Sequence, residues 1–334
     1  MKIQDIIKYK VGTPVFLDYK GINTLYSHII TNYPIENIAK SYKITFDNNF
    51  YFIRDKEITY ILHIENIDQK WDVKNFILKN FYFNIEGLVT ESKNTFSDPF
   101  DFYYTLKEIQ SIKKYVDINS LLEIILSKTL TEIPIKNNFI IDTRNSSIQF
   151  FRIIMEEMFR RGVSYQGILL MDEYHLLEHF IPEITKLKEV NHDKDFHPEG
   201  DGFDHLLETS SYIKTTDYAF AWATLLHDIG KPFSYKEENR KFSNHGKIGA
   251  EIAAKILKKM EYDEEVIKET YFLIENHMIP PMIDKLSYEK KEKIINSKYF
   301  KKLLKLYKID ILSSHKDLSK YSKTKKYIAE LEKI

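Results

Sequence analysis

The sequence predicts an α+β protein, in which a small mixed N-terminal domain precedes a mostly helical neck and an all-helical C-terminal domain. Two observations carry this prediction. Between residues 44 and 64, short runs rich in β-branched and aromatic residues alternate with polar turns, which is typical of strands. From about residue 106 the apolar residues recur at helical spacing instead, and no strand-like run is evident after about residue 142.

The N-terminal domain is expected to contain strands at residues 44–46, 50–53 and 58–64. The polar triplet 47–49 between the first two runs favours a hairpin. The segment 23–33 is expected to form a helix that packs on the resulting sheet.

Three apolar stripes predict helices further along the chain. They run through residues 106–115, 148–158 and 176–181, and the third ends near Pro182. The expected division of the chain is a mixed α+β domain at 1–105, a helical neck at 106–194, a helical domain at 195–320 and a basic helix or tail at 321–334.

Composition restricts the chemistry. The chain contains no cysteine, so disulfides and thiolate chemistry are excluded, and any metal site must use histidines and carboxylates. The N-terminus lacks an apolar signal core, and no apolar run approaches the ~18–20 residues of a membrane span. The protein is therefore expected to be soluble and cytoplasmic, without a membrane partner.

The charge is balanced overall but distributed unevenly. Residues 285–334 hold 15 lysines and 6 acidic residues, a local net charge of +9. This basic stretch is either a solvated helical surface or a surface for a polyanion such as RNA.

The most informative motif is the His227-Asp228 pair, at the end of an apolar helix that Asp217 is expected to cap. An unpaired buried carboxylate is costly, so a cation is its simplest partner. Further imidazoles and carboxylates interrupt apolar helices elsewhere: His205, His245, His277 and Asp310. Each residue alone is more often ordinary than a ligand, but the ordered set predicts a metal site. Nitrogen and oxygen donors without thiolate suit manganese, iron, cobalt, nickel, zinc or magnesium.

With these residues in place, the sequence resembles the HD-domain metal-dependent phosphohydrolases over about residues 195–320. The stretch 196–205, in which a His-Pro-Glu-Gly-Asp run precedes the first ligand histidine, looks most like the HD domain of bacterial CCA-adding tRNA nucleotidyltransferases. The matching motifs are His205, residues 227–232, Asn244-His245-Gly246, Glu275-Asn276-His277 and Asp310. A weaker likeness over residues 144–184 implies that family's helical neck.

The N-terminal domain resembles the nucleotidyltransferase head of that family in a degenerate form. Val11-Gly12-Thr13 is at best a remnant of the family's Gly-Gly motif, and no Asp-x-Asp pair for magnesium occurs between residues 1 and 105. Residues 78–84 resemble a further family motif with Asn80 in place of Asp, and residues 98–100 match the phrase that follows it. The resemblance implies a nucleotidyltransferase fold without transferase activity; the alternative is an unrelated α+β domain.

The resemblance also implies phosphoester hydrolysis at one or two divalent ions. One ion would be held by His205, His227, Asp228 and Asp310. Asp228 would bridge to a second ion held by His245 and His277. With a single ion, those two histidines would instead contact the phosphate or relay a proton.

The residues expected to act in catalysis are Asp228, Lys231 and His245. Lys231 would neutralise phosphoryl charge, although a lysine here is also what a helix C-terminus favours. The implied substrates are nucleotides or RNA 3′ ends, as 2′,3′-cyclic phosphodiesters or phosphomonoesters, with tRNA as a further partner. The alternative is a catalytically inactive RNA-binding protein derived from a tRNA nucleotidyltransferase. The missing carboxylate pair argues against an active CCA-adding enzyme, and no pattern indicates an oligomeric state.

Overall fold

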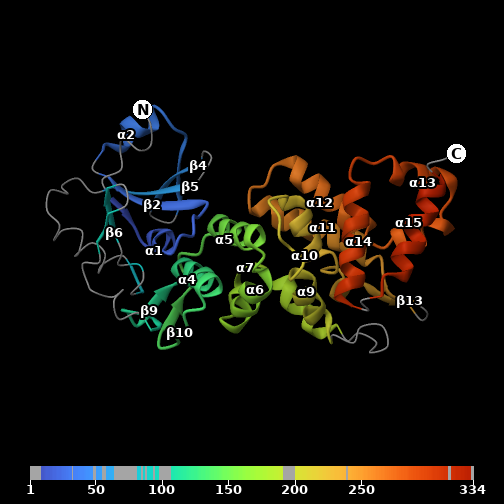
Figure 1. Cartoon of the computed structure of the whole chain (residues 1–334), viewed down its shortest axis with the longest axis horizontal. Helices are drawn as coiled ribbons and strands as arrows, with labels where there is room; N and C mark the ends of the chain where they lie inside the picture. Colours follow the sequence, from blue (N-terminus) through green and yellow to red (C-terminus); the bar gives the residue numbers. More distant parts are fainter. Residues whose placement is uncertain are drawn as a thin grey trace. The chain divides into compact units, whose positions relative to one another are not determined.

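The computed structural model describes residues 9–31, 33–47, 50–54, 58–63, 81–83, 86, 89–92, 95–97, 107–190, 200–237, 240–314 and 317–331. The chain divides into two compact units, Met1–Glu157 and Met158–Ile334 (Figure 1). The first unit contains a sheet and the second is mostly helical, which confirms the predicted α+β class. The finer division into four parts stays a prediction.

A mixed sheet forms the centre of the first unit, with the strand order β3-β4-β5-β2-β1-β6-β7. β2 pairs in parallel with β5, and the other neighbours pair antiparallel. The strands are β1 (Tyr9–Val11), β2 (Tyr26–Thr31), β3 (Ile44–Asp47), β4 (Phe50–Arg54), β5 (Ile58–His63), β6 (Val89–Ser92) and β7 (Thr95–Ser97). β3, β4 and β5 confirm the three predicted strands, and β3 and β4 pair as expected, although residues 48 and 49 lie outside the described residues.

The helix predicted over residues 23–33 is wrong, because this segment contains β2, a central strand of the sheet. Its last three residues, Ile29, Ile30 and Thr31, are all buried. Consecutive buried β-branched residues are typical of a strand that is covered on both faces. Pairing with β1 and β5 on either side therefore decides the conformation here, rather than the local apolar spacing.

Helices pack beside this sheet within the same unit. They are α1 (Thr13–Tyr19), α2 (Ile35–Ala39) and α4 (Ile118–Thr131). α1 follows Gly12, whose φ of 80° requires glycine. An apolar cluster of Ile29, Ile38, Ile53 and Ile61 joins α2 to the strands.

The helix predicted over residues 106–115 is also wrong. Residue 106 lies outside the described residues, and the rest of the segment forms β8 (Ile109–Gln110) and β9 (Tyr115–Asp117). These strands pair in parallel with β10 (Ile135–Lys136) and β11 (Ile140–Asp142). The helix begins only at Ile118, because the Asp117 carboxylate caps it by accepting from the Asn119 and Ser120 N–H groups.

The second unit is built from helices. The predicted helix at 148–158 is confirmed as α5 (Ile148–Arg161), which crosses the boundary between the units, and that at 176–181 as α7 (Leu176–Phe180). The others are α6 (Ser164–Glu173), α8 (Pro182–Thr185), η3 (Lys186–Glu189), α9 (Gly202–Ser210), α10 (Tyr218–Leu226), η4 (Lys231–Phe233), α11 (His245–Lys259), α12 (Glu264–Asn276), η5 (Pro280–Lys285), α13 (Tyr288–Ile295), α14 (Phe300–Ser313) and α15 (Ser319–Leu331). None of the described helices is long and apolar enough to cross a membrane.

The expectation of no strand after residue 142 is wrong, because β12 (Tyr235–Glu237) and β13 (Arg240–Ser243) pair as an antiparallel hairpin. Both strands lie in a charged segment without apolar alternation. The strands are joined by backbone pairing, and the hydrophobic pattern of the sequence gives no signal for them.

Three helices of this unit, α10, α12 and α14, run in the same direction, and Figure 1 draws them close together. Near their first turns, the Lys302 ammonium lies 2.6 Å from the Asp217 carboxylate and also pairs with Glu269. Their opposite ends carry predicted metal ligands. The shared direction therefore brings those ligands to one end of the three-helix group.

Candidate metal centre

The six predicted metal ligands converge in the second unit. Their donor atoms form two groups, and within each group the atoms lie within 4.8 Å of one another. The first group is His205, His227 and Asp310, and the second is Asp228, His245 and His277. Among the described residues of the first unit there is no comparable group.

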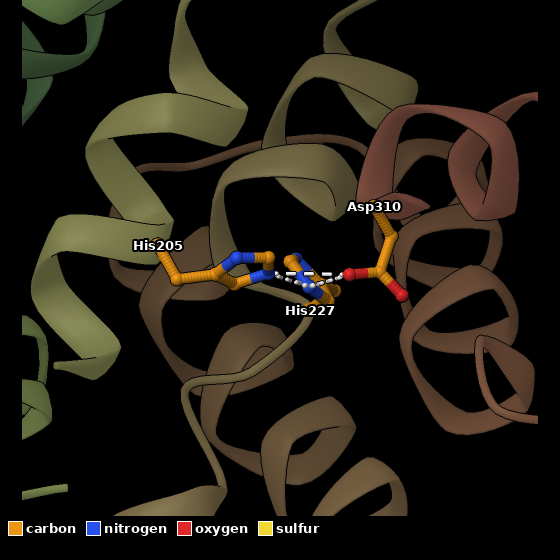
Figure 2. Close-up of side chains that lie close together, drawn as sticks. All are labelled: His205, His227 and Asp310. Carbon is orange, nitrogen blue, oxygen red and sulfur yellow. Dashed lines mark hydrogen bonds and ion pairs between the residues drawn. The ribbon is translucent and has the colours of Figure 1, made fainter. Parts of the chain in front are cut away.

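The first group joins three helices (Figure 2). His205 comes from α9, His227 follows the last turn of α10, and Asp310 comes from α14. The Asp310 Oδ1 lies 3.2 Å from the His205 Nε2 and 3.6 Å from the His227 Nε2. Both rings are almost fully buried, whereas the Asp310 side chain is 25% exposed, so this group is open to solvent on the carboxylate side.

Asp228 belongs to the second group, but its carboxylate faces histidines of both groups. Its Oδ2 lies 3.5 Å from the His227 Nε2 and 3.7 Å from the His205 Nε2. Its Oδ1 lies 3.4 Å from the His245 Nε2 and 3.6 Å from the His277 Nε2. Each oxygen of one carboxylate is thus directed to a different pair of imidazoles, which is the arrangement of a bridging ligand.

The protonation of three rings follows from their backbone partners. The Nδ1 atoms lie within hydrogen-bond distance of carbonyl oxygens, namely His227 on Thr224 (3.1 Å), His245 on Phe242 (2.8 Å) and His277 on Ile274 (2.7 Å). A carbonyl oxygen only accepts, so Nδ1 must carry the proton and, in the neutral ring, Nε2 must present a lone pair.

The ring nitrogens lie close together in two pairs, and in the second pair the lone pairs of His245 and His277 face each other. The Nε2 atoms of His245 and His277 are 3.0 Å apart, and those of His205 and His227 are 3.3 Å apart. Two nitrogens bound to one ion at about 2.0–2.1 Å lie about 2.9–3.4 Å apart at octahedral or tetrahedral angles. The donor set and its spacing therefore fit divalent ions, one for each pair.

The charges of the buried groups suit a cation. Burial raises the pKa of Asp228, but the Lys231 ammonium and the imidazoles of His227 and His245 outweigh it and hold this pKa well below its ordinary value. The Lys231 Nζ lies 2.6 Å from the Asp228 Oδ2. Burial lowers the pKa of His277, which favours the neutral ring that a metal requires.

The ends of the parallel helices add to this electrostatic preference. His227 is the C-cap of α10 and His277 is the C-cap of α12, while α14 ends three residues after Asp310. Helix C-termini carry partial negative charge. Three of them meeting at one place favour a cation there.

Glycines allow the ligand-bearing segments to touch through their backbones. A Cβ on Gly230 would lie 2.1 Å from the His245 carbonyl oxygen and 2.6 Å from the Gly249 nitrogen. A Cβ on Gly246 would lie 2.9 Å from the Glu275 carbonyl oxygen. These contacts place the start of α11 directly against the segments that carry Asp228 and His277.

Several parts of the site were not foreseen from the sequence. The carbonyls of Thr224 and Ile274, three residues before their histidines, could have been found, because a helix end leaves carbonyls unpaired there. The Phe242 carbonyl could not, since it depends on a φ of 65° at that residue. The Phe242 ring also lies 5.7 Å from the Lys231 ammonium.

The first unit contains a different buried polar cluster that was also not predicted. The His28 Nε2 lies 2.9 Å from the Glu123 Oε1. The Glu86 Oε2 accepts hydrogen bonds from the backbone N–H groups of Tyr82 (2.8 Å) and Phe83 (2.7 Å). Burial, with Glu123 nearby, raises the pKa of Glu86 to about 8. Of the head motifs, Asn80 and residues 98–100 lie outside the described residues.

A helical unit that gathers four histidines and two aspartates in this way has the donor set of a domain that could hold metal ions. Consistent with this, residues 202–309 match the family described as the HD domain. The match begins three residues before His205 and ends one residue before Asp310, so it contains five of the six predicted ligands.

Curated relatives match a part of the chain. The A-adding tRNA nucleotidyltransferase of Deinococcus radiodurans is 28% identical over 133 residues, which is 37% of this chain and 30% of the relative. The multifunctional CCA protein of Psychromonas ingrahamii is 31% identical over 100 residues, 29% of this chain and 24% of the relative. The matches thus span less than a third of these relatives' lengths.

Two solved structures share the fold over nearly the whole chain. A CCA-adding enzyme with ATP aligns with a TM-score of 0.50 at 12% identity, covering 97% of this chain and 78% of that one. A tRNA-processing enzyme with CTP aligns with a TM-score of 0.50 at 12% identity, covering 99% and 90%. Both alignments cover nearly the whole chain, including the N-terminal unit. They confirm the expected likeness of its fold to that of CCA-adding enzymes.

Proposed function

We propose that this protein is a metal-dependent phosphohydrolase that acts on a phosphoester of a nucleotide or an RNA end. The observation that carries the proposal is the position of Asp228, whose two oxygens face two separate pairs of imidazoles. One ion would be held by His205, His227, Asp310 and Asp228, and the second by Asp228, His245 and His277. Such ions would polarise a phosphoryl oxygen and lower the pKa of a water molecule.

The side chains around the ligands have roles of their own in this proposal. Lys231 is held at Asp228 by an ion pair and also lies near the Phe242 ring, so its charge is fixed beside the ligands. It would offset the negative charge that develops on a phosphoryl group. The backbone carbonyls that accept from the Nδ1 atoms would hold the rings of His227, His245 and His277 in their ligating orientation.

The substrate class rests on the relatives and on charge. One matched relative is a tRNA nucleotidyltransferase, and the two aligned structures are complexes with ATP and CTP. The basic stretch 285–334 adds positive charge on the helical unit. A 2′,3′-cyclic phosphodiester or a phosphomonoester at an RNA 3′ end, including that of tRNA, would fit both the relatives and the positive charge.

The test combines elemental analysis with assays of hydrolysis. Purified protein is expected to hold up to two divalent ions per chain, among manganese, iron, cobalt, nickel, zinc and magnesium. It should hydrolyse nucleoside 2′,3′-cyclic phosphates, or a chromogenic phosphodiester, when manganese, nickel or cobalt is supplied. Equal rates for the wild type and Asp228→Ala on every substrate would refute the proposal.

A second candidate function is a catalytically inactive RNA-binding protein. One ground is that no Asp-x-Asp pair occurs between residues 1 and 105, which we take to mean that nucleotide transfer is lost. The other ground is that a matched relative is a tRNA nucleotidyltransferase. This function predicts salt-dependent tRNA binding without turnover. Incorporation of nucleotides into tRNA would contradict the loss of transfer.

A further inference from the structure

A groove of about 720 Å³ lies along one side of α11, outside the ligand cluster. This volume falls within the range of small-molecule sites, about 300–1,000 Å³. The groove is lined by Glu183, Phe233, Ile248, Glu251, Ile252, Lys255, Ile256, Lys258 and Lys259. Neither the ligand set nor the proposed chemistry uses any of these side chains.

Two lining residues of the groove, Phe233 and Ile248, lie close along the chain to residues of the candidate metal centre. Ile248 is three residues after His245, and residues three apart lie on the same face of a helix. Phe233 is two residues after Lys231, in the same short helix, η4. From Ile248 to Lys259 the groove follows α11 for about three turns, or about 16 Å. It therefore leads away from the ligands toward the C-terminal end of α11.

The lining changes character along this path. The half near the ligands is apolar, with Phe233, Ile248 and Ile252, and the Phe233 side chain is 38% exposed. The Lys186 ammonium lies 5.6 Å from the Phe233 ring centroid, which helps to hold the ring in place. An exposed aromatic ring in a groove is suited to stacking on a planar base.

The half of the groove toward the C-terminal end of α11 carries positive charge that suits the phosphate backbone of a nucleic acid. Lys255, Lys258 and Lys259 follow one another within the last turns of α11, and all three are exposed. Glu251 and Glu183 also line the groove, and carboxylates there would disfavour a phosphate but can accept hydrogen bonds from the amino group of a base. Bases would thus bind in the apolar half of the groove, and phosphates would bind beside the lysines of the other half.

We propose that this groove binds the strand that leads to the hydrolysed phosphoester, so that the substrate is a single-stranded nucleic-acid end of two or more nucleotides. With the terminal phosphoester at the ligands, its nucleoside lies against Phe233, Ile248 and Ile252. The preceding phosphates lie against Lys255, Lys258 and Lys259. This proposal deepens the phosphohydrolase proposal and rests on it for the position of the terminal phosphoester.

The test measures binding separately from turnover. The metal-loaded full chain is titrated into a fluorescein-labelled hexaribonucleotide whose 3′-phosphate is replaced by a phosphonate that cannot be hydrolysed, and anisotropy is read. A mononucleotide and a deoxy hexamer compete as unlabelled ligands. The hexamer should bind at least tenfold more tightly than the mononucleotide, and comparison with the deoxy strand shows whether the 2′-hydroxyls contribute.

Matched variants locate the binding. Phe233→Ala should weaken hexamer binding by about tenfold, and Phe233→Tyr should restore it, because stacking survives. Lys255→Gln with Lys259→Gln should reduce the slope of log affinity against log salt by about 1.4, as two lost contacts to a single strand require. Lys214→Gln with Lys268→Gln, at exposed positions outside the groove and outside the basic stretch, is the control and should leave both quantities unchanged.

The outcomes separate this proposal from the one it rests on. Binding that depends on Phe233 and the two lysines, without hydrolysis by the metal-loaded wild type, would keep the groove and remove the phosphohydrolase. A hexamer that binds no better than a mononucleotide would overturn the groove, whatever the hydrolysis. Wild-type affinity in the groove variants, with loss of affinity in Lys301→Gln with Lys308→Gln on the exposed surface of α14, would overturn the groove and place the strand on the basic C-terminal helices instead.

Discussion

The two units each bury a cluster of histidines and carboxylates, but the clusters balance their charge in different ways. In the first unit, His28 pairs with Glu123, and the buried Glu86 has a pKa raised to about 8, so it keeps its proton at neutral pH. In the second unit, Asp228 is held as a carboxylate and imidazole lone pairs face one another. The charge of the first cluster is reduced by the proton on Glu86, whereas the second presents donor atoms that suit a cation in addition to Lys231.

This difference shows how buried polar residues can be assigned a role. A cluster that satisfies its own hydrogen bonds and charges is complete without a ligand. A cluster that leaves several acceptors facing each other is incomplete, because acceptors alone cannot satisfy one another. Four experiments test this difference between the two clusters, in order of decreasing expected effect.

Replacing Asp228 with Asn should have the largest effect, because it removes the carboxylate that both groups share. Loss of a residue that merely supports a ligand typically costs 10–100-fold in metal affinity, so loss of the shared ligand should cost more than about 100-fold. Elemental analysis and hydrolysis rates would measure this. Asp284→Asn, at an exposed position of η5, is the control, and equal metal content in both variants would contradict the assignment.

Removing metal by chelation should destabilise the second unit and leave the first unchanged. A ligand at 1,000 times its dissociation constant stabilises the folded state by about 4 kcal/mol, and chelation removes this contribution. Hydrogen exchange of the full chain, read by mass spectrometry, separates the two units. Faster exchange should appear in peptides that contain His227 and His277. Equal changes around His28 and Glu123 would mean that the first cluster also depends on metal.

Glu86→Gln should stabilise the first unit at neutral pH. The folded pKa is raised to about 8 from an ordinary 4.5, so the folded state retains a proton that the unfolded state has lost. Wild-type stability should therefore fall as pH rises from about 4.5 to about 8, where the loss is complete. Glutamine keeps the acceptor for Tyr82 and Phe83 but does not titrate, so the variant should be more stable by about 4 kcal/mol at pH 8.

Urea unfolding of both proteins at pH 5 and pH 8, followed by exchange in peptides of the first unit, would measure this difference. The gap between the variant and the wild type should widen with pH. A constant gap would show that Glu86 is ionised in the folded protein, and that the first cluster is not balanced by a proton.

Asp217→Ala should have the smallest effect. Asp217 caps α10 by accepting from the Phe220 N–H, and it pairs with Lys302 at the end of the helix far from the ligands. Loss of such a cap costs about 1 kcal/mol. Thermal unfolding should register this loss, while the metal-to-protein ratio stays at the wild-type value. A lower ratio would mean that the far end of α10 also positions His227.

The ligand set could be read from the sequence because each of its members interrupts an apolar helix. The same reasoning applied to Glu123, which stands in the apolar run Leu121–Leu126, would have revealed the second cluster. Its partners could not have been read in this way, because His28 lies in a segment predicted as helix, and Glu86 is defined by hydrogen bonds to its own local backbone.

The strands show the same limit. Runs dense in β-branched and aromatic residues, such as 58–63, were recognisable on their own. β2 was not, because its conformation depends on neighbours that are distant in sequence. The direction shared by α10, α12 and α14 likewise arises from contacts such as those of Lys302, which join residues far apart along the chain.

The contact between Gly230 and the first turn of α11 has a consequence for how this protein can vary. Because the two backbones touch, the positions of Asp228 and His245 are fixed by that contact and not by the chain that connects them. The connecting hairpin can therefore change in length or sequence among descendants while the ligands stay in register, as surface connections generally do. Gly230 itself has no such freedom, so variation should accumulate in the hairpin and stop at the glycine.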